Sequence, residues 1–138
     1  MQFTIHADGG ARGNPGPAGA GAVVRDGQGN IVATVSDYLG IRTNNFAEYE
    51  AVIQALTKVH ELAKGRLAET AVMVKMDSEL VVKQMNGVYK IKHPDMLSQA
   101  ARLKELAAPL GAIFFAHVPR AQNSDADKLA NEAMDRGA

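Results

Sequence analysis

Alternating hydrophobic and polar residues open the chain. From Gln2 to Asp8 the apolar side chains of Phe3, Ile5 and Ala7 alternate with polar ones. A period of two is typical of a strand that is buried on one face. We therefore predict a strand over 2–8 that ends at Asp8, where a connection rich in glycine and proline begins.

Two further runs of the first forty residues have strand character, at 19–24 and 30–38. The residues Asp26-Gly27-Gln28-Gly29 between them suit a tight hairpin, because Asp-Gly pairs and a second glycine favour such turns. We therefore predict that the first three strands form an antiparallel meander.

Helical spacing replaces the alternation after Gly40. Apolar residues from Tyr49 to Ala63 recur at helical intervals, and Gly65 is a suitable stop. Beyond it we predict strands at 71–76 and 112–118, and helices at 79–85, from Pro94 to Leu110 and after an Asn123 cap. Strand–helix–strand alternation requires parallel crossovers, so an α/β fold with a mixed sheet and helices packed on it is expected.

Composition narrows the class of protein. The chain has 138 residues, which suits one domain over 1–138, and no cysteine, so neither a disulfide framework nor a thiolate zinc site is available. No apolar run approaches the ~20 residues of a membrane span, and strand-like alternation at residue 2 leaves no room for a signal peptide. We expect a soluble, cytoplasmic protein without a membrane partner. Its net charge of zero argues against nucleic-acid binding by bulk electrostatics alone.

Four acids fall at the ends of predicted elements, and each has an ordinary structural explanation. Asp8 suits a turn, and Glu48 suits a capping box that begins at Asn45. Asp77 suits a helix N-cap, and Asp127 suits the first turn of a helix, where the helix dipole favours an acid. Taken singly, none of the four indicates a function.

Taken together, the four acids predict a metal site. They could converge on one edge of the sheet if the first and fourth strands are neighbours, because ligands gather at the carboxyl ends of parallel strands. Clustered carboxylates without histidine or cysteine favour Mg²⁺ or Mn²⁺ over zinc. Two such ions ~3.5–4 Å apart can activate a water and stabilise the leaving oxygen of a phosphodiester.

Four motifs carry a family resemblance that covers essentially the whole chain. They are Asp8-Gly9-Gly10 with the run 13–19, Thr43–Glu48, Met76-Asp77-Ser78 and Asn123–Ala130. In this order they resemble type 1 ribonuclease H. The resemblance implies a five-stranded sheet, antiparallel in its first three strands and then parallel. It also implies an endonuclease that cuts the RNA strand of RNA/DNA hybrids and leaves 5′-phosphate and 3′-hydroxyl ends. A catalytically silent nucleic-acid-binding module and a nuclease that prefers double-stranded RNA are the alternatives.

By position, the resemblance assigns the metal-binding carboxylates to Asp8, Glu48, Asp77 and Asp127, which would hold two Mg²⁺ or Mn²⁺ ions. Asp8 would bridge both ions, with Glu48 and Asp77 toward the attacking water and Asp127 on the other ion. Asp125 competes with Asp127 for the last place. The family pattern puts its acid directly before Lys-Leu-Ala, which selects Asp127.

The resemblance also suggests substrate contacts. Neutral amides can contact minor-groove edges and the RNA 2′-hydroxyl without adding charge, and cations or hydroxyls can contact phosphates. The amides are those of Asn14, Asn44 and Asn45, and the candidate phosphate contacts are Arg12, Ser78 and Arg120.

Two segments depart from many relatives. The segment 118–123 is short and lacks a loop histidine associated with product release; His117 is expected within the last strand, and Arg120 is the candidate replacement. The segment 87–94 lacks a long basic protrusion with tryptophan, as in the compact archaeal and some bacterial members. We therefore expect a monomer that binds RNA/DNA hybrid with modest affinity.

Overall fold

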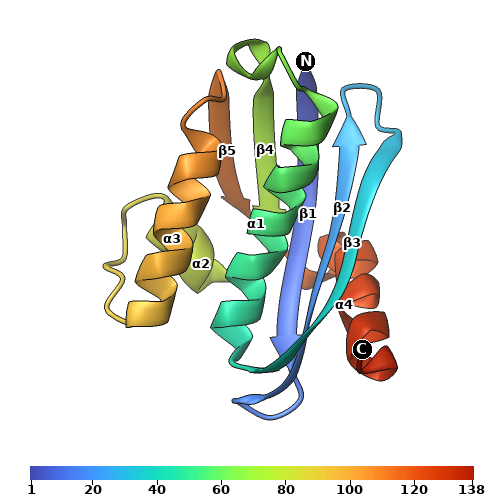
Figure 1. Cartoon of the computed structure of the whole chain (residues 1–138), viewed down its shortest axis with the longest axis vertical. Coiled ribbons are helices and arrows are strands. Elements are labelled where there is room, and N and C mark those ends of the chain that lie inside the picture. Colours follow the sequence, from blue (N-terminus) through green and yellow to red (C-terminus); the bar gives the residue numbers. More distant parts are fainter.

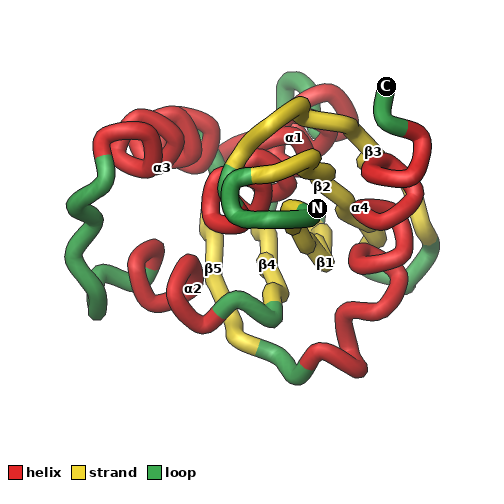
Figure 2. Tube along the Cα trace, turned by 90° about the horizontal axis from the view of Figure 1, so that it is seen from below, coloured by secondary structure: helices red, strands yellow, loops and turns green.

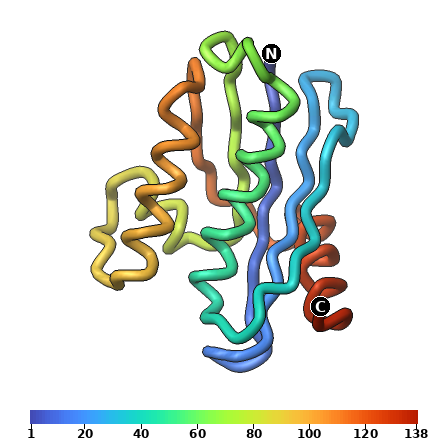
Figure 3. The backbone as a smooth tube through the Cα atoms, in the orientation of Figure 1, coloured from blue at the N-terminus to red at the C-terminus, as the bar shows by residue number.

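Five strands and four α-helices make up the fold in the computed structural model, which describes residues 1–138. Figures 1 and 3 follow the chain from β1 to α4. The strands are β1 (Gln2–Ala11), β2 (Gly16–Asp26), β3 (Ile31–Arg42), β4 (Ala71–Met76) and β5 (Ala112–His117). The helices are α1 (Asn44–Leu62), α2 (Glu79–Met85), α3 (Pro94–Ala107) and α4 (Ser124–Arg136), with short 3₁₀ turns at Leu67–Glu69 and Arg120–Asn123.

The strands form one mixed sheet in the order β3-β2-β1-β4-β5. β1 pairs antiparallel with β2, and β2 pairs antiparallel with β3. β4 joins β1 in parallel, and β5 joins β4 in parallel. The predicted mixed sheet is therefore confirmed, including the neighbouring placement of the first and fourth strands on which convergence of the acids depends.

Helices cover both faces of the sheet. α1 and α4 contact the same three strands, β1 to β3, and α1 also contacts α3. Figure 2 shows α1 and α3 on one side and α4 on the other. A core of 23 buried residues joins the sheet to α1, α2 and α3, with Tyr49 and Leu56 among its largest side chains. None of the helices combines the length and the apolar composition needed to cross a bilayer.

Two glycines allow helices to lie directly on the sheet backbone. A Cβ atom at Gly9 of β1 would lie 2.2 Å from the carbonyl carbon of Ala47 on α1. On the other face, a Cβ at Gly21 of β2 would lie 2.3 Å from the carbonyl oxygen of Ala126 on α4. Each contacted alanine directly precedes one of the four predicted carboxylates. The two glycines therefore set how closely those carboxylates approach β1.

The prediction that β1 ends at Asp8 was wrong. Its parallel pairing with β4 stops at Ala7, but its antiparallel pairing with β2 continues to Ala11. The glycines after Asp8 are paired strand residues rather than a loop, because β2 starts early enough, at Gly16, to pair with them. Asp8 is thus held within a strand at the point where β4 ends beside it.

The predicted cap residues of α1 and α2 were also wrong. Thr43, not Asn45, caps α1, because its hydroxyl accepts a hydrogen bond from the amide of Phe46 at 3.2 Å. Ser78, not Asp77, caps α2, and its hydroxyl accepts from the amide of Val81 at 3.3 Å. Neither Glu48 nor Asp77 is therefore occupied by a capping role.

The remaining boundaries follow the predicted pattern with small differences. β4 and α2 match the predicted ranges, and His117 is the last residue of β5. β3 runs on to Arg42 because it stays paired with the start of β2. α1 begins at Asn44, before the first apolar residue of its stripe, and α3 ends at Ala107, before Leu110. Residues that flank the regularly spaced apolar positions do not define where a helix or strand begins or ends.

Gly9→Ala should destabilise the fold because the new methyl group would collide with the backbone of α1 rather than with a movable side chain. We expect a loss of about 1–3 kcal/mol or more in the free energy of unfolding, measured by urea denaturation. Gly10→Ala is the matched control: its nearest neighbours would be 3.9 Å away. Equal stability of the two variants would show that α1 does not rest on Gly9.

Candidate active site

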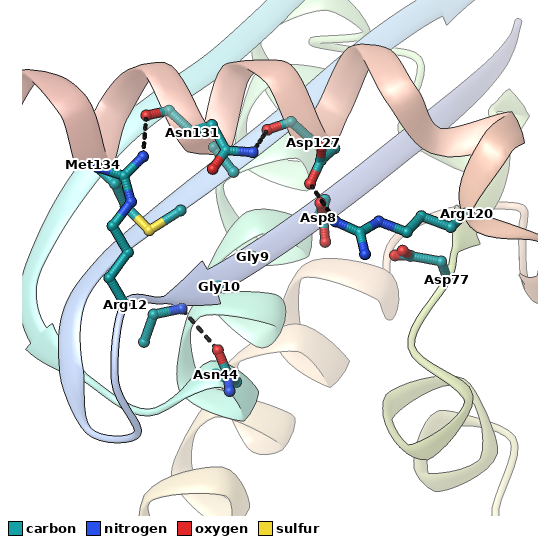
Figure 4. Close-up of a pocket in the computed structure, with 12 residues that line it drawn as sticks. Asp8, Gly9, Gly10, Arg12, Asn44, Asp77, Arg120, Asp127, Asn131 and Met134 are labelled. Atoms are coloured by element: carbon teal, nitrogen blue, oxygen red, sulfur yellow. Dashed lines mark hydrogen bonds and ion pairs between the residues drawn. The ribbon is translucent and has the colours of Figure 1, made fainter.

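One cavity brings together three of the four predicted carboxylates. Asp8, Asp77 and Asp127 lie at the same end of it, as Figure 4 shows. They come from β1, from the residue after β4 and from the first turn of α4. The other residues that line the cavity are Gly9, Gly10, Ala11, Arg12, Asn44, Arg120, Ala130, Asn131 and Met134.

Strand register explains why these acids meet. Ala7 pairs with Met76, so the next residue of each strand, Asp8 or Asp77, leaves the end of the parallel pair. Asp8 also lies opposite Gly21 across the antiparallel pair. Since α4 rests on Gly21, its first turn places Asp127 beside Asp8. Backbone pairing and one close helix contact therefore assemble the cluster.

Glu48 approaches the cluster from α1, which covers the opposite face of the sheet, and it does not line the cavity. Burial raises the pKa of Glu48 to about 7; a hydrogen bond from the hydroxyl of Ser78 opposes this shift, and the charge of Asp77 adds to it. Glu48 is therefore close enough to Asp77 for their charges to interact, although the two side chains come from different layers of the fold.

Asp8 is the most perturbed group of the cluster. Its side chain is buried, and burial raises its pKa to about 8, with further contributions from the charge of Asp77, from Asp127 and from the charge of Glu48. Asp127 acts both by its charge and by a hydrogen bond that requires the proton on Asp8. All three other acids therefore act on the Asp8 carboxyl, which makes it the centre of the site.

No buried cation balances these acids. Arg120 approaches Asp127 at 3.9 Å, but its side chain is 81% exposed. Arg12, at the other end of the cavity, pairs with Asp135 at 2.6 Å. Asp125 pairs with Arg25 at 2.9 Å and does not line the cavity, so the geometry agrees with the choice of Asp127.

The donor set suits a hard divalent cation. Its ligands would be carboxylate oxygens, which Mg²⁺ and Mn²⁺ prefer, with no histidine or cysteine among them. In this structure no three such side chains are set at ligating spacing around a single point. A bound ion would instead offset the repulsion that raises the pKa of Asp8.

The predicted amides lie in two places. Asn44 lines the cavity, where its side-chain oxygen accepts a hydrogen bond from the amide of Ala11 at 2.7 Å. Asn14 lies next to it and accepts from the backbone amide of Asn44 at 3.1 Å. Asn14 and Asn45 line a second depression with Thr43, outside the carboxylate cavity.

The structure separates the candidate phosphate contacts. Arg12 and Arg120 line the carboxylate cavity. Ser78 lies outside it and instead caps α2, where its hydroxyl accepts from the amide of Val81. Its hydroxyl is therefore engaged within the protein.

Three residues of this region were not predicted as part of it. Asn131 and Met134 line the cavity four and seven residues after Asp127, so the helical period could have identified them. Asn123 was predicted as a helix cap, but its side chain makes no capping hydrogen bond. Its amide instead donates to Asp77, a contact for which the sequence has no local signal.

Comparison with known proteins places this fold and these motifs in a family. A family profile described as "Reverse transcriptase-like" matches residues 6–133. The Bifunctional protein Rv2228c of Mycobacterium tuberculosis is 45% identical over 139 residues, which cover 100% of this chain and 37% of that protein. Ribonuclease HI of Halobacterium salinarum is 43% identical over 133 residues, which cover 95% of this chain and 64% of that protein. The chain thus spans less than two thirds of the length of these relatives.

Solved structures of relatives superimpose closely. The N-terminal RNase H domain of the mycobacterial protein has a TM-score of 0.90 at 44% identity and covers 97% of this chain and 99% of that chain. The halobacterial RNase H1 also has a TM-score of 0.90, at 40% identity, and covers 99% of each chain. LC11-RNase H1, solved in complex with an RNA/DNA hybrid, has a TM-score of 0.91 at 45% identity and covers 97% of each chain.

Metal-free protein should lose stability as pH rises from about 4 to 8. In the unfolded chain the Asp8 carboxyl ionises at its ordinary pKa of 3.8, whereas in the folded protein it keeps its proton up to a pKa of about 8. Its contribution is therefore fully present below the unfolded pKa and is lost as pH rises through the folded pKa. Urea denaturation in EDTA at several pH values measures this slope.

Asp8→Asn should flatten that slope, because an amide does not ionise. At pH 8 we expect the metal-free variant to be more stable than the wild type by up to about 5 kcal/mol, because a difference of one pKa unit corresponds to about 1.4 kcal/mol and the pKa of Asp8 rises from 3.8 to about 8 on folding. Asp125→Asn is the control, since Asp125 lies outside the cavity, and its slope should match the wild type. A wild-type stability that increases over this pH interval would contradict the raised pKa of Asp8.

Proposed function

The chain belongs to the type 1 ribonuclease H family, and on this premise we propose that it is an endonuclease that hydrolyses the RNA strand of RNA/DNA hybrids. The observation that carries the proposal is the convergence of Asp8, Asp77 and Asp127 on one cavity, with Glu48 acting on the cluster from α1. The hybrid bound by LC11-RNase H1 supports the substrate class, since that relative shares nearly the whole fold.

The proposed activity depends on two divalent ions, Mg²⁺ or Mn²⁺. Asp8, Glu48, Asp77 and Asp127 would hold them, and this oxygen-only donor set around the buried Asp8 fits such ions. Ions bound there would supply a nucleophilic water at neutral pH and charge neutralisation at the scissile phosphate. Hydrolysis on this pattern leaves 5′-phosphate and 3′-hydroxyl ends.

The chain's own residues contribute position and charge. Asp8 is held in place by strand pairing on both sides of its neighbour Ala7, and its carboxylate would contribute to holding the ions. Asp127 is carried by a helix that is held by backbone contact with Gly21. The backbone that carries Asp8 and Asp127 is therefore fixed without substrate, and such preorganisation reduces the reorganisation required during the reaction.

Recognition of the hybrid would use neutral and basic groups around the cavity. Asn44 lines the cavity and Asn14 lies next to it, and both offer amides suited to minor-groove edges and 2′-hydroxyls. Arg12 and Arg120 line the same cavity and could contact phosphates on either side of the scissile bond. Asn45 and Ser78 remain outlying candidates, since neither lines this cavity.

We further propose a single ribonuclease H domain over 1–138 that acts as a monomer in the cytoplasm. The connection between α2 and α3 is only eight residues long, 86–93, and contains no tryptophan. Figures 2 and 3 place this connection on the far side of the molecule from α4. Without a longer protrusion, the protein should bind hybrid with modest affinity.

Incubation with labelled substrates tests the proposed activity. We expect cleavage of the RNA strand of an RNA/DNA hybrid in Mg²⁺ or Mn²⁺ and none in EDTA, with weaker or no cleavage of double-stranded RNA, double-stranded DNA and single strands. Asp77→Asn should reduce cleavage more than ~100-fold, because loss of an outer partner alone costs 10–100-fold, while the circular dichroism spectrum stays the same. Hybrid binding without cleavage in either metal would favour a silent binding module.

Substitution of single acids in α4 tests which of them, Asp125 or Asp127, is the fourth metal ligand. Asp127→Asn should abolish cleavage, since Asp127 acts directly on Asp8. Asp125→Asn should keep most of the activity, because Asp125 pairs with Arg25 at an exposed position outside the cavity. The rates are compared in single-turnover assays at saturating Mg²⁺. The opposite ranking would place the ligand at Asp125.

A further inference from the structure

Asn123 ends the 3₁₀ turn before α4 and is almost completely buried, with 1% of its surface exposed. It stands at the N-cap position of α4, where an asparagine side chain usually accepts a hydrogen bond from the helix. Here its side chain makes no such bond. The reason for a buried asparagine at this point must therefore lie elsewhere.

The side-chain amide of Asn123 connects parts of the site that are distant in sequence. Its nitrogen donates to the carbonyl oxygen of Ala7 at 2.8 Å and to Oδ1 of Asp77 at 3.2 Å. Ala7 is the last β1 residue paired with β4, and it directly precedes Asp8. One amide group therefore joins β1, the end of β4 and the start of α4, each of which carries a carboxylate of the site.

The other half of the Asn123 amide group has no partner. Its oxygen Oδ1 is buried and accepts no hydrogen bond. An unpaired buried acceptor destabilises the folded state, so a hydrophobic side chain of the same shape would suit packing better. An aspartate in its place would add another negative charge to a crowded cluster. A neutral side chain that donates two hydrogen bonds avoids both repulsion and loss of contact.

We propose that Asn123 is a positioning residue that acts through Asp77. By donating to one oxygen of that carboxylate, and to the backbone next to Asp8, it fixes the orientation of Asp77 toward the cluster without contacting the substrate. Hydrogen-bonded partners behind metal ligands commonly set the affinity for the metal. The inference rests on the proposed metal-dependent activity for its kinetic part, whereas its metal-binding part can be measured independently.

The test compares two buried amides. Asn123→Leu removes the donor and keeps the approximate shape of the side chain. Gln99→Met is the matched control, because Gln99 is also buried, donates one hydrogen bond to the carbonyl of Phe46 at 2.9 Å and has an unpaired oxygen. Mn²⁺ binding is measured by titration calorimetry on the full chain, unfolding by urea, and cleavage of RNA/DNA hybrid under single-turnover conditions and in steady state.

Asn123→Leu should weaken Mn²⁺ binding 10–100-fold and lower kcat by a similar factor at unchanged KM for hybrid. Gln99→Met should change only the unfolding midpoint. If Asn123 acts through Asp77, adding Asn123→Leu to Asp77→Asn should weaken Mn²⁺ binding no further. Asn123→Ala replaces the leucine variant if that protein does not fold.

Equal Mn²⁺ affinity in the wild type and in either folded Asn123 variant would overturn the positioning role. A full additional loss of affinity in the Asp77→Asn background would also overturn it, because the effect would not pass through Asp77. If the wild type binds Mn²⁺ but does not cleave hybrid, the proposed function fails. The affinity measurements would still decide the role of Asn123.

Discussion

The repulsion between clustered carboxylates is the constraint around which this structure is organised. The three other acids act on the buried Asp8, and the raised pKa of Asp8 reflects how little freedom the cluster has. The restraint comes from the backbone: strand pairing fixes Asp8, and contacts at Gly9 and Gly21 hold α1 and α4 close. Stability and the proposed metal affinity are therefore opposing consequences of one arrangement, since charges that destabilise the metal-free fold attract the cation.

The two faces of the sheet differ in what they contribute to the fold and to the site. The apolar core lies on the face of the sheet that α1 covers and includes residues of α2 and α3. On the opposite face, α4 carries Asp127 and rests on the small residues of β2 that admit the helix. Because α1 and α4 contact the same three strands from opposite sides, Asp8 of β1 lies in the part of the sheet that both helices cover.

Much of the fold could be predicted because the spacing of apolar residues and the order of strands and helices can be taken directly from the sequence. The strand at 71–76, the helix at 79–85 and the mixed sheet follow from spacing alone. The end of β1 could not, because the glycines after Asp8 become strand only through pairing with β2. The cap of α1 was mistaken because Thr43, Asn44 and Asn45 are all competent caps, and Asn44 is occupied by contacts with Asn14 and Ala11. The site acids were predictable as motifs, whereas the partners of Asn123 are up to 116 residues away.

The contact between Gly21 and α4 has a consequence for how variation in this chain should be interpreted. Gly21 has no functional group and lines no part of the cavity, yet its missing side chain determines where a carboxylate stands. A larger residue there would push the helix outward and take Asp127 with it. Loss of activity from such a change would resemble simple misfolding, although its cause would be a displaced ligand. The position of a carboxylate in this site thus depends on a residue that has no functional group itself.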